Sequence, residues 1–594
     1  MLDLQAIGGF GLGKASYGIF VYIMKRNLPR FASISQSAKA DIINILVIIA
    51  IWAVMVILVN PLGDFPLNDD WAFGRAVQSV VEKGEFQLSG WGAMNLFSQV
   101  FWGALFCWPF GFSFTALRFS TLTLGLIGVI ATYGLLRESN SNPKISPIVG
   151  ALLVAINPIY FGLSNTFMTD VPFFAFTTLS LYLLVRGLRY NSLLEVIIGI
   201  LMACVALLIR QLGLAIFVAF GCAYIIKKGV NVQNFIKGFL PTLLGLSIQI
   251  LYQKWLQFTD RLPAMYGTQI KGLVEAFYKG FAHVIFYFTG STLVALVYLG
   301  LFIFPLIIIL FSLKFKKLDS RQQSLALFAL STFFVVVMGI IVSNGKRMPL
   351  TGNIITDFGL GPLTLRDSFI LKALSTPTVL QMLWLVITAI GVVGAALLLE
   401  YLFFALMQTF ALYKKYEVVD KSKNWLTTLI ISFILIYFLP LGPQGFFDRY
   451  LLLLLPLLMM LVSVSTTNIS NWKVDSKVIS IALIMMLLYG GFTIGATHDY
   501  LSWNRVRWQA LHSLMQESQI SPNQIDGGFE FNGWYLYDDF KYKQKPDKSW
   551  WWVDNDDYII SFGPITGYEE VKRYPFSRWL PFGKERILVL DKNN

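Results

Sequence analysis

The sequence predicts a polytopic α-helical membrane protein with a small α/β domain outside the membrane. Of its 594 residues, 56% are hydrophobic and only 14% are charged, whereas an ordinary soluble chain is about 45–50% apolar and about 25% charged. The apolar residues form repeated runs of about 18–25 residues, the length that crosses a bilayer as a helix. After residue 497 the composition changes, and short stretches alternate between polar and apolar residues as strands do.

About thirteen apolar runs are predicted to span the membrane. They lie near residues 43–60, 113–136, 145–163, 170–187, 193–209, 211–227, 235–254, 288–313, 323–344, 380–409, 425–441, 449–467 and 477–497. We assign 92–110 to a helix beside the membrane. Residues 1–42 contain Lys14 and end in a basic cluster, so we expect an amphipathic cytoplasmic segment on the membrane surface and not a signal peptide.

The loops between these runs alternate in charge. One set is rich in Lys and Arg, for example at 314–321 and 414–423, and the other set holds few basic residues. The positive-inside rule makes the basic set cytoplasmic. An odd number of spans then puts the N-terminus inside and the C-terminal domain outside, as in a multi-pass protein of the cell (inner) membrane. Because these loops account for the net charge of +13, no nucleic-acid partner is expected.

This topology divides the chain into three parts. Residues 1–42 are the cytoplasmic segment, 43–497 the transmembrane domain with a first outer loop at 61–112, and 498–594 the extracytoplasmic domain. In the last part "SWNRVRWQALHSLMQ" has the pattern of an amphipathic helix. "IDGGFEFNGWYLY", "DDYIISFG" and "RILVLDK" are predicted to form strands.

Several kinds of site are not indicated by the sequence. The three cysteines lie in apolar runs without a CxxC spacing, and the three histidines are scattered, so neither a disulfide framework nor a zinc site is predicted. No phosphate-binding glycine pattern of a nucleotide site is found. No cofactor is assigned.

Acids and bases instead gather at the predicted outer rim. They are Asp69 and Asp70 in "NDDWAF", Asp170 in "NTFMTDVPFF", Arg210 in "ALLIRQLGL", Arg449 in "GFFDRYLLLLLP", and Lys346 and Arg347 in "NGKRMPL". Singly, each is typical of a charge that anchors a helix end in water or caps it. Together they indicate a chemistry: a carboxylate can act as general base on an acceptor hydroxyl or amine. Basic groups can hold a phosphate as it leaves. The substrate implied is a sugar on a lipid phosphate.

In the order "DDWAF", "FMTDVPF", "LLIRQLGL" and "DRYLLLLLP", the chain resembles membrane glycosyltransferases of the GT-C superfamily. Within it, the chain is most similar to the branch of aminoarabinose transferases and protein O-mannosyltransferases (glycosyltransferase family 39-like). The resemblance implies transfer of a sugar, usually with inversion, from a polyprenyl or dolichyl monophosphate carrier to an acceptor on the outer side.

The resemblance also implies roles for individual residues. Asp69 corresponds to the catalytic acid of the family, with Asp70 as its neighbour, Phe73 as the following aromatic and Asp170 as the second outer acid. Arg210 and Arg449, with Lys346 and Arg347, are expected to bind the donor phosphate, while Trp71, Trp91 and Asn95 line the substrate site. A divalent cation, if one binds, would lie between Asp69 and Asp170. One departure is clear: the lysine-proline pair of aminoarabinose transferases is replaced by "LSGWGAMNLF", which argues against aminoarabinose and lipid A as substrates.

Two alternatives remain open from sequence. A transporter or flippase of lipid-linked sugars would need charged or broken helices near the bilayer midplane, but the predicted spans carry few charges at their centres. A glycan polymerase or ligase would use a pyrophosphate carrier with the same architecture. The acceptor is left open among lipid, glycan and protein, and so is the oligomeric state.

Overall fold

The structure is a computed structural model. It describes residues 36–139, 146–315, 320–357, 359–362, 364–365, 381–415, 421–465, 474–538, 551–553 and 555–593. Two compact units, 1–50 and 51–594, are treated separately, and every contact given below lies within the second. Most of the predicted segment 1–42 lies outside the described residues, and helix α2 (Gln36–Val59) begins near its end.

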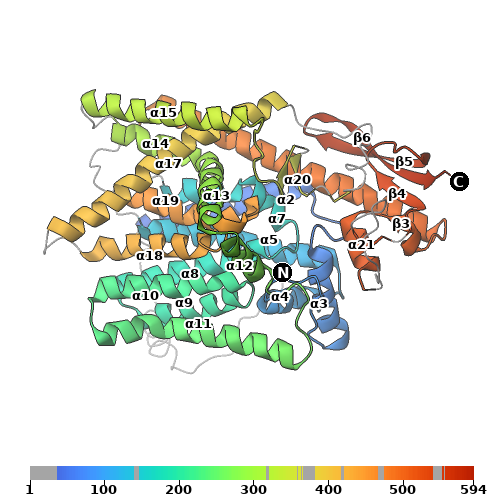
Figure 1. Ribbon diagram of the computed structural model, residues 1–594, viewed down its shortest axis with the longest axis horizontal. Helices are drawn as coiled ribbons and strands as arrows, with labels where there is room; N and C mark the ends of the chain where they lie inside the picture. Colours follow the sequence, from blue (N-terminus) through green and yellow to red (C-terminus); the bar gives the residue numbers. More distant parts are fainter. Residues whose placement is uncertain are drawn as a thin grey trace, which may run out of the picture. The chain divides into compact units, whose positions relative to one another are not determined.

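The described chain is mostly helical, as predicted (Figure 1). After α2 come α3 (Asp70–Lys83), α4 (Phe97–Cys107), α5 (Phe114–Ser139), α6 (Ser146–Ala155), α7 (Pro158–Ser164), α8 (Asp170–Tyr190), α9 (Leu193–Leu207), α10 (Leu214–Lys228), α11 (Val232–Phe258), α12 (Thr268–Tyr278), α13 (Phe281–Phe302), α14 (Phe304–Phe315), α15 (Ser320–Ser343), α17 (Gln381–Lys415), α18 (Lys421–Phe438), α19 (Leu454–Ser465), α20 (Ser476–Gln516) and α21 (Phe529–Leu536). Short 3-10 turns lie at Gln211–Gly213, Gly442–Gln444, Asp448–Leu451 and Pro522–Gln524.

Ten helices of the described chain are long and apolar enough to cross a membrane, or eleven if α6 and α7 form one bent span. The predicted class of multi-pass membrane protein is therefore confirmed, although the count of about thirteen is not. The bend of 59° between α6 and α7 follows from Asn157-Pro158, where the Asn157 side chain accepts hydrogen bonds from the N–H groups of Ile159 and Tyr160 and so starts a new helix.

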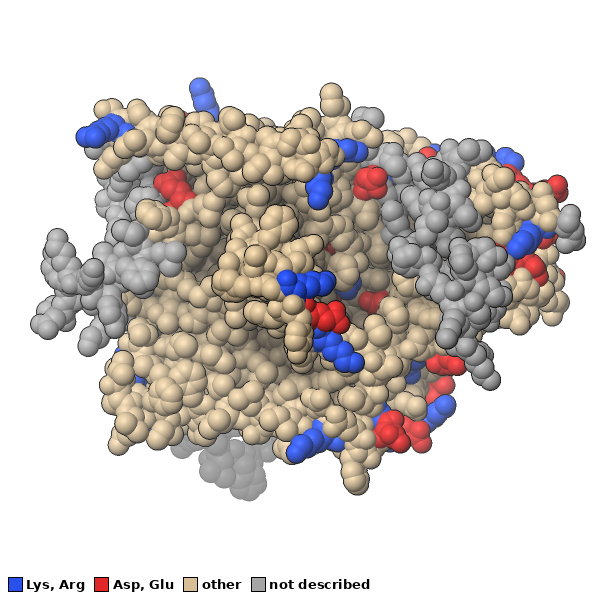
Figure 2. Space-filling model, in the orientation of Figure 1, with Lys and Arg blue, Asp and Glu red and all other residues tan. Residues whose placement is uncertain are grey.

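Many apolar side chains on these helices are exposed, including Ile57 (76%), Phe328 (71%) and Met382 (77%). In water such surface would be costly, but in a bilayer it meets lipid chains. On the face drawn in Figure 2, tan atoms cover most of the helical part, and the charged side chains lie toward its edges and in one group near its middle. Inside the second unit, α8 packs between α5 and α9, α10 against α11 and α18, and α13 against α17.

A small sheet follows the last long helix, in the order β3 (Ile525–Asp526), β4 (Tyr558–Ser561), β6 (Phe582–Lys592) and β5 (Tyr568–Trp579). β3 pairs with β4 in parallel, and the other pairs are antiparallel. Strands β5 and β6 pack on α20, and α21 packs on α3 (Figure 1). The predicted α/β character of the C-terminal region is confirmed.

One predicted strand is wrong. In "IDGGFEFNGWYLY" only two residues form a strand, and most of the remainder is the helix α21. Its polar residues Glu530 and Asn532 alternate with apolar ones, but both are fully buried and hydrogen-bonded. The alternation therefore does not separate a buried face from an exposed one. Likewise, the predicted boundary at 497/498 lies inside α20, which runs unbroken for 41 residues.

Arg118 of α5 holds the loop between α2 and α3. Its guanidinium is 1% exposed, and its N–H groups donate to four backbone carbonyl oxygens, those of Pro61 (2.5 Å), Gly63 (3.0 Å), Phe65 (3.0 Å) and Asn165 (2.8 Å). Asp64 in turn accepts from the N–H of Phe114, at the start of α5 (2.7 Å). These bonds fix the loop that leads to Asp69.

We expect Arg118→Met to destabilise the protein by at least about 4 kcal/mol, because four buried carbonyl oxygens lose their donor and each unsatisfied group costs about 1–3 kcal/mol. Thermal unfolding in detergent measures the change. Arg189→Met is the control, since Arg189 is half-exposed and lies 3.5 Å from Glu138, a pair worth about 0.5 kcal/mol. Equal effects of the two substitutions would contradict this role of Arg118.

Candidate active site

A cavity of about 430 Å³ lies beside the acidic pair. Its walls come from the loop after α2 with α3, the loop before α4, α12, the loop after α15, the 3-10 turn at 448–451 and the C-terminal region. The lining residues are Asn68, Asp69, Phe73, Trp91, Ala93, Met94, Met265, Gln269, Asn353, Pro362, Thr364, Phe447, Arg449, Tyr450, Phe529 and Trp551. Six segments far apart in the sequence therefore meet here.

Asp69 precedes α3 and reaches the cavity. Its Oδ1 accepts a hydrogen bond from Nε1 of Trp91 at 2.9 Å. Burial raises the pKa of this carboxyl above its usual range, while the positive charge of Arg449 and the Trp91 hydrogen bond act in the opposite direction. A carboxylate that is accessible from a cavity and has a raised pKa is suited to accept a proton.

Asp70 has different surroundings. It is 3% exposed and does not line the cavity. Its Oδ1 accepts from the N–H of Phe167 (2.8 Å) and its Oδ2 from the N–H of Leu67 (3.3 Å). Burial raises the pKa of Asp70 well above its usual range, against the effect of these bonds. Asp70 thus ties the first loop to the segment that precedes α8.

Asp170, Arg210 and Arg449 form a buried cluster in which each residue is at most 5% exposed. Asp170 begins α8, and its Oδ1 accepts from Nη1 of Arg210 at 2.6 Å. Nε of Arg449 lies 3.7 Å from the other oxygen. The two guanidinium groups lie 4.7 and 5.7 Å from the ring of Tyr450. Two arginines therefore share one carboxylate.

The cluster is not saturated by hydrogen bonds. Within the described part of the chain, Nη2 of Arg210 and Nε and Nη1 of Arg449 are buried without a hydrogen-bond partner. Buried polar groups are normally hydrogen-bonded, and unpaired guanidinium N–H groups match the oxygens of a phosphate. Because Arg449 also lines the cavity, an anion there would meet these donors.

Asp448 fixes the position of Arg449. Its fully buried carboxyl accepts from the N–H groups of Ile354 (3.1 Å), Ile355 (2.8 Å) and Arg449 (2.8 Å). It therefore joins the loop after α15 to the turn that carries Arg449. Burial raises the pKa of Asp448 to about 6, against the effect of these bonds.

Of the other predicted residues, Phe73 and Trp91 line the cavity, and the rest lie apart from it. Trp71 is fully buried in a cluster of aromatic rings, with Tyr537 at 5.1 Å and Trp552 at 5.2 Å. Asn95 is buried. Its amide nitrogen donates to the carbonyl oxygen of Leu207 and to Oε1 of Gln249, and its amide oxygen accepts from the hydroxyl of Tyr266. Lys346 is exposed and Arg347 is half-buried, and neither lines the cavity.

No group of three or more His, Cys, Asp or Glu side chains that could hold a metal ion occurs among the described residues. The Asp170 carboxylate faces two arginines, which disfavours a cation beside it. Sequence analysis missed Glu530, Phe529 and Trp551, which belong to the cavity wall or lie behind it. The aromatic residues in "GGFEFNGW" and "SWWWVDNDD" are the sequence feature that could have indicated this region.

Comparisons with known proteins can now be set beside this geometry. Residues 100–253 match the family described as dolichyl-phosphate-mannose-protein mannosyltransferase. No curated protein matches the chain.

Two solved structures are similar at low identity. ArnT from Cupriavidus metallidurans, bound to undecaprenyl phosphate, is 10% identical over 92% of this chain and 97% of its own, with a TM-score of 0.46. The oligosaccharyltransferase of Archaeoglobus fulgidus, tethered to an acceptor peptide, is 12% identical over 80% of this chain, with a TM-score of 0.41. This chain covers 58% of the length of that archaeal protein.

We expect Asp448 to make stability depend on pH. Because the pKa of Asp448 is higher in the folded than in the unfolded protein, its contribution is complete below about pH 4 and is lost as the pH rises through about 6. Relative to Asp448→Asn, which cannot titrate, the wild type should lose about 1 kcal/mol between pH 5 and pH 7. Thermal unfolding of both proteins across this range measures the difference, and parallel curves would contradict it.

The family match runs from within α4 to within α11 and includes Asp170 and Arg210 of the buried cluster, but not Asp69 or Arg449. The predicted resemblance to GT-C glycosyltransferases of the protein O-mannosyltransferase branch is confirmed by this match over residues 100–253.

Proposed function

We propose that this chain is a glycosyltransferase that moves a sugar from a polyprenyl-phosphate carrier to an acceptor on the outer face of the cell membrane. The observation that carries the proposal is the juxtaposition, in one cavity, of the Asp69 carboxylate with Arg449, whose unpaired N–H groups belong to a cluster with Arg210. A base and a phosphate site are the two groups that such a transfer needs.

In the proposed reaction, Asp69 accepts a proton from the acceptor hydroxyl or amine. The freed electron pair attacks the anomeric carbon of the sugar. The bond between this carbon and the phosphate oxygen breaks, and the electron pair leaves with the phosphate, which gains one negative charge. Arg449 and Arg210 stabilise that charge, and Asp170 keeps both guanidinium groups in place.

The rival functions receive less support. A flippase would need charged groups along a path through the helices, whereas the charges described above gather at the helix ends around one cavity. A pyrophosphate carrier brings one more negative charge than a monophosphate carrier, whereas the cluster, with Asp170 counted, has an excess of only one positive charge. The proposal includes the orientation with residues 498–594 outside the cell, which the basic loops support.

The decisive experiment uses the purified full chain in detergent with polyprenyl-phosphate sugars of different classes. Wild type should release the carrier and transfer the sugar, and Asp69→Asn should lower kcat by at least about a thousandfold, since it removes the base. Glu82→Gln, an exposed acid at the other end of α3, is the matched control. Full activity of Asp69→Asn would refute the role of Asp69, and bilayer crossing without transfer would refute the enzyme.

The pH dependence of kcat follows from the same assignment. Asp69 must be ionised to act as a base, and burial raises its pKa. We therefore expect kcat to fall about tenfold per pH unit below a pKa that lies above the usual value for an aspartate. A pH-rate profile with saturating donor measures this limb, and a flat profile down to pH 4 would contradict the assignment.

Binding of undecaprenyl phosphate tests the phosphate site. Arg449→Gln should weaken it by about 10–100-fold, because a charge-assisted hydrogen bond is worth about 1.5–3 kcal/mol. Arg573→Gln, on the exposed strand β5, should leave it unchanged. If instead Lys346→Gln or Arg347→Gln weakens binding and Arg449→Gln does not, the phosphate binds at the loop after α15.

A further inference from the structure

The residue before Asp69 has an unusual backbone. Asn68 has a φ of +56°, in the left-handed region that asparagine tolerates better than most residues. Its backbone N–H donates to Oε1 of Glu530 at 2.8 Å, across 462 positions of sequence. A helix of the C-terminal region therefore holds the backbone N–H of the residue before Asp69.

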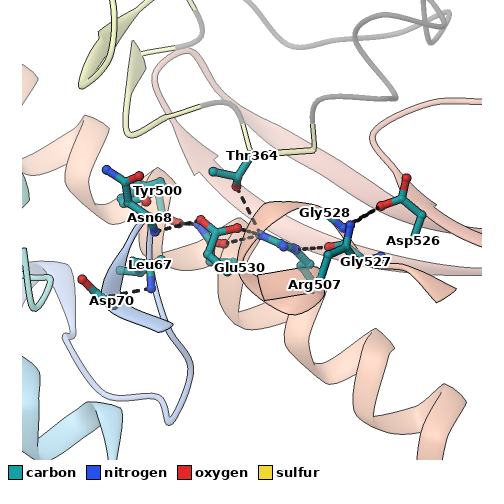
Figure 3. Close-up of polar contacts among 12 residues, drawn as sticks. Leu67, Asn68, Asp70, Thr364, Tyr500, Arg507, Asp526, Gly527, Gly528 and Glu530 are labelled. Carbon is teal, nitrogen blue, oxygen red and sulfur yellow. Dashed lines mark hydrogen bonds and ion pairs between the residues drawn. The ribbon is translucent and has the colours of Figure 1, made fainter. Parts of the chain in front are cut away.

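Glu530 is itself fixed by an ion pair. Its Oε2 accepts from Nη1 of Arg507 at 2.8 Å, and both side chains are fully buried. Arg507 also donates to the carbonyl oxygen of Gly527 (2.8 Å) and to Oγ1 of Thr364 (3.3 Å). Figure 3 shows Glu530 between Asn68 and Arg507, with Thr364 beside them. With both oxygens of Glu530 engaged, the carboxylate has little freedom to move.

This ion pair lies behind the cavity wall. Asn68, Thr364 and Phe529 all line the cavity, whereas Glu530 and Arg507 do not. The N–H of Phe529 also donates to the carbonyl oxygen of Thr364 at 2.9 Å. The pair thus joins three separate segments of the wall without contacting the space where substrate would bind.

Asp69 depends on this support. On its other side, Asp70 is held by the N–H of Phe167. Among the described residues, the Asp69 carboxylate itself has a hydrogen bond to the Trp91 side chain only. Its position is consequently set by the backbone of residues 67–70, which Glu530 anchors at the Asn68 N–H and Phe167 anchors at the Asp70 carboxylate.

We infer that Glu530, held by Arg507, is a positioning residue that sets the location of Asp69 relative to Arg449 through the Asn68 peptide group. The inference rests on the proposed function, in which Asp69 is the base. A displacement of about 1 Å at a reacting group can lower a rate by about a hundredfold. The C-terminal region would then support the reaction without supplying a catalytic residue.

Two variants separate positioning from simple stabilisation. Glu530→Asp keeps the charge beside Arg507 but withdraws the carboxylate from Asn68 by one methylene. The double variant Glu530→Gln with Arg507→Met removes both charges together, so that no buried charge is left unpaired, and keeps an amide oxygen within reach of Asn68. The matched control is Glu517→Asp, since Glu517 forms an exposed pair with Lys572 at 3.5 Å.

If Glu530 positions Asp69, the single variant should lower kcat at least about tenfold with the KM for the donor within about threefold, because the arginine cluster is untouched. The double variant should keep most of kcat, and the control all of it. Wild-type kcat in Glu530→Asp would overturn the inference. So would a larger kcat loss in the double variant, because the charge and not the reach would then matter.

Hydrogen exchange measured by mass spectrometry gives a readout independent of activity. Peptides covering residues 65–70 should exchange faster in Glu530→Asp than in wild type or Glu517→Asp, since the Asn68 N–H loses its acceptor. Unchanged exchange would overturn the inference. If wild type transfers no sugar at all, the proposed function fails, and this exchange comparison still decides whether Glu530 holds the loop.

Discussion

One carboxylate shared by two buried arginines is the interaction on which the site depends. A buried charge is costly unless it is paired, so Asp170, Arg210 and Arg449 determine how the surrounding segments meet. Asp170 must start α8, the chain must break between α9 and α10 at Arg210, and the turn at Asp448–Leu451 must deliver Arg449. The cluster keeps an excess of one positive charge beside the cavity, which is the electrostatic condition for binding an anion.

The remaining walls are arranged around this cluster by backbone hydrogen bonds to buried side chains. Arg118 binds four carbonyl oxygens of the first loop and its neighbour, and Asp448 binds the N–H groups of the loop after α15. Loops have few regular hydrogen bonds of their own, so each needs such a side chain to stay in one place. The site is thus composed of loops that are held in one conformation, as helices and strands are.

Much of this could be predicted from the sequence. Apolar runs predicted the membrane class, and the charge pattern of the loops placed Asp69, Asp170, Arg210 and Arg449 at one rim. In the structure, Asp170 forms ion pairs with both arginines, and Asp69 lines the same cavity as Arg449. Lys346 and Arg347 were grouped with them because a rim position does not reveal distance. A local sequence pattern relates residues that are close in the chain and does not show which distant residues meet in the fold.

The long-range partners could not be predicted for the same reason. The stretch that contains Glu530 and Asn532 was predicted to be a strand, because its polar and apolar residues alternate. Their burial depends on Arg507 and Asp526, which periodicity does not connect to them. The family resemblance implied that Asn95 and Trp71 line the site, yet their side chains point into packed surroundings.

The unbroken course of α20 has a mechanical consequence. Its 41 residues form a rod about 60 Å long, about twice the thickness of the hydrocarbon core. The rod carries Arg507 near its far end and packs on the sheet. A thinner or thicker bilayer changes the tilt of a spanning helix, and a rigid rod converts that tilt into a sideways shift at its tip. Lipid thickness could thereby tune the geometry of the distant wall of the cavity.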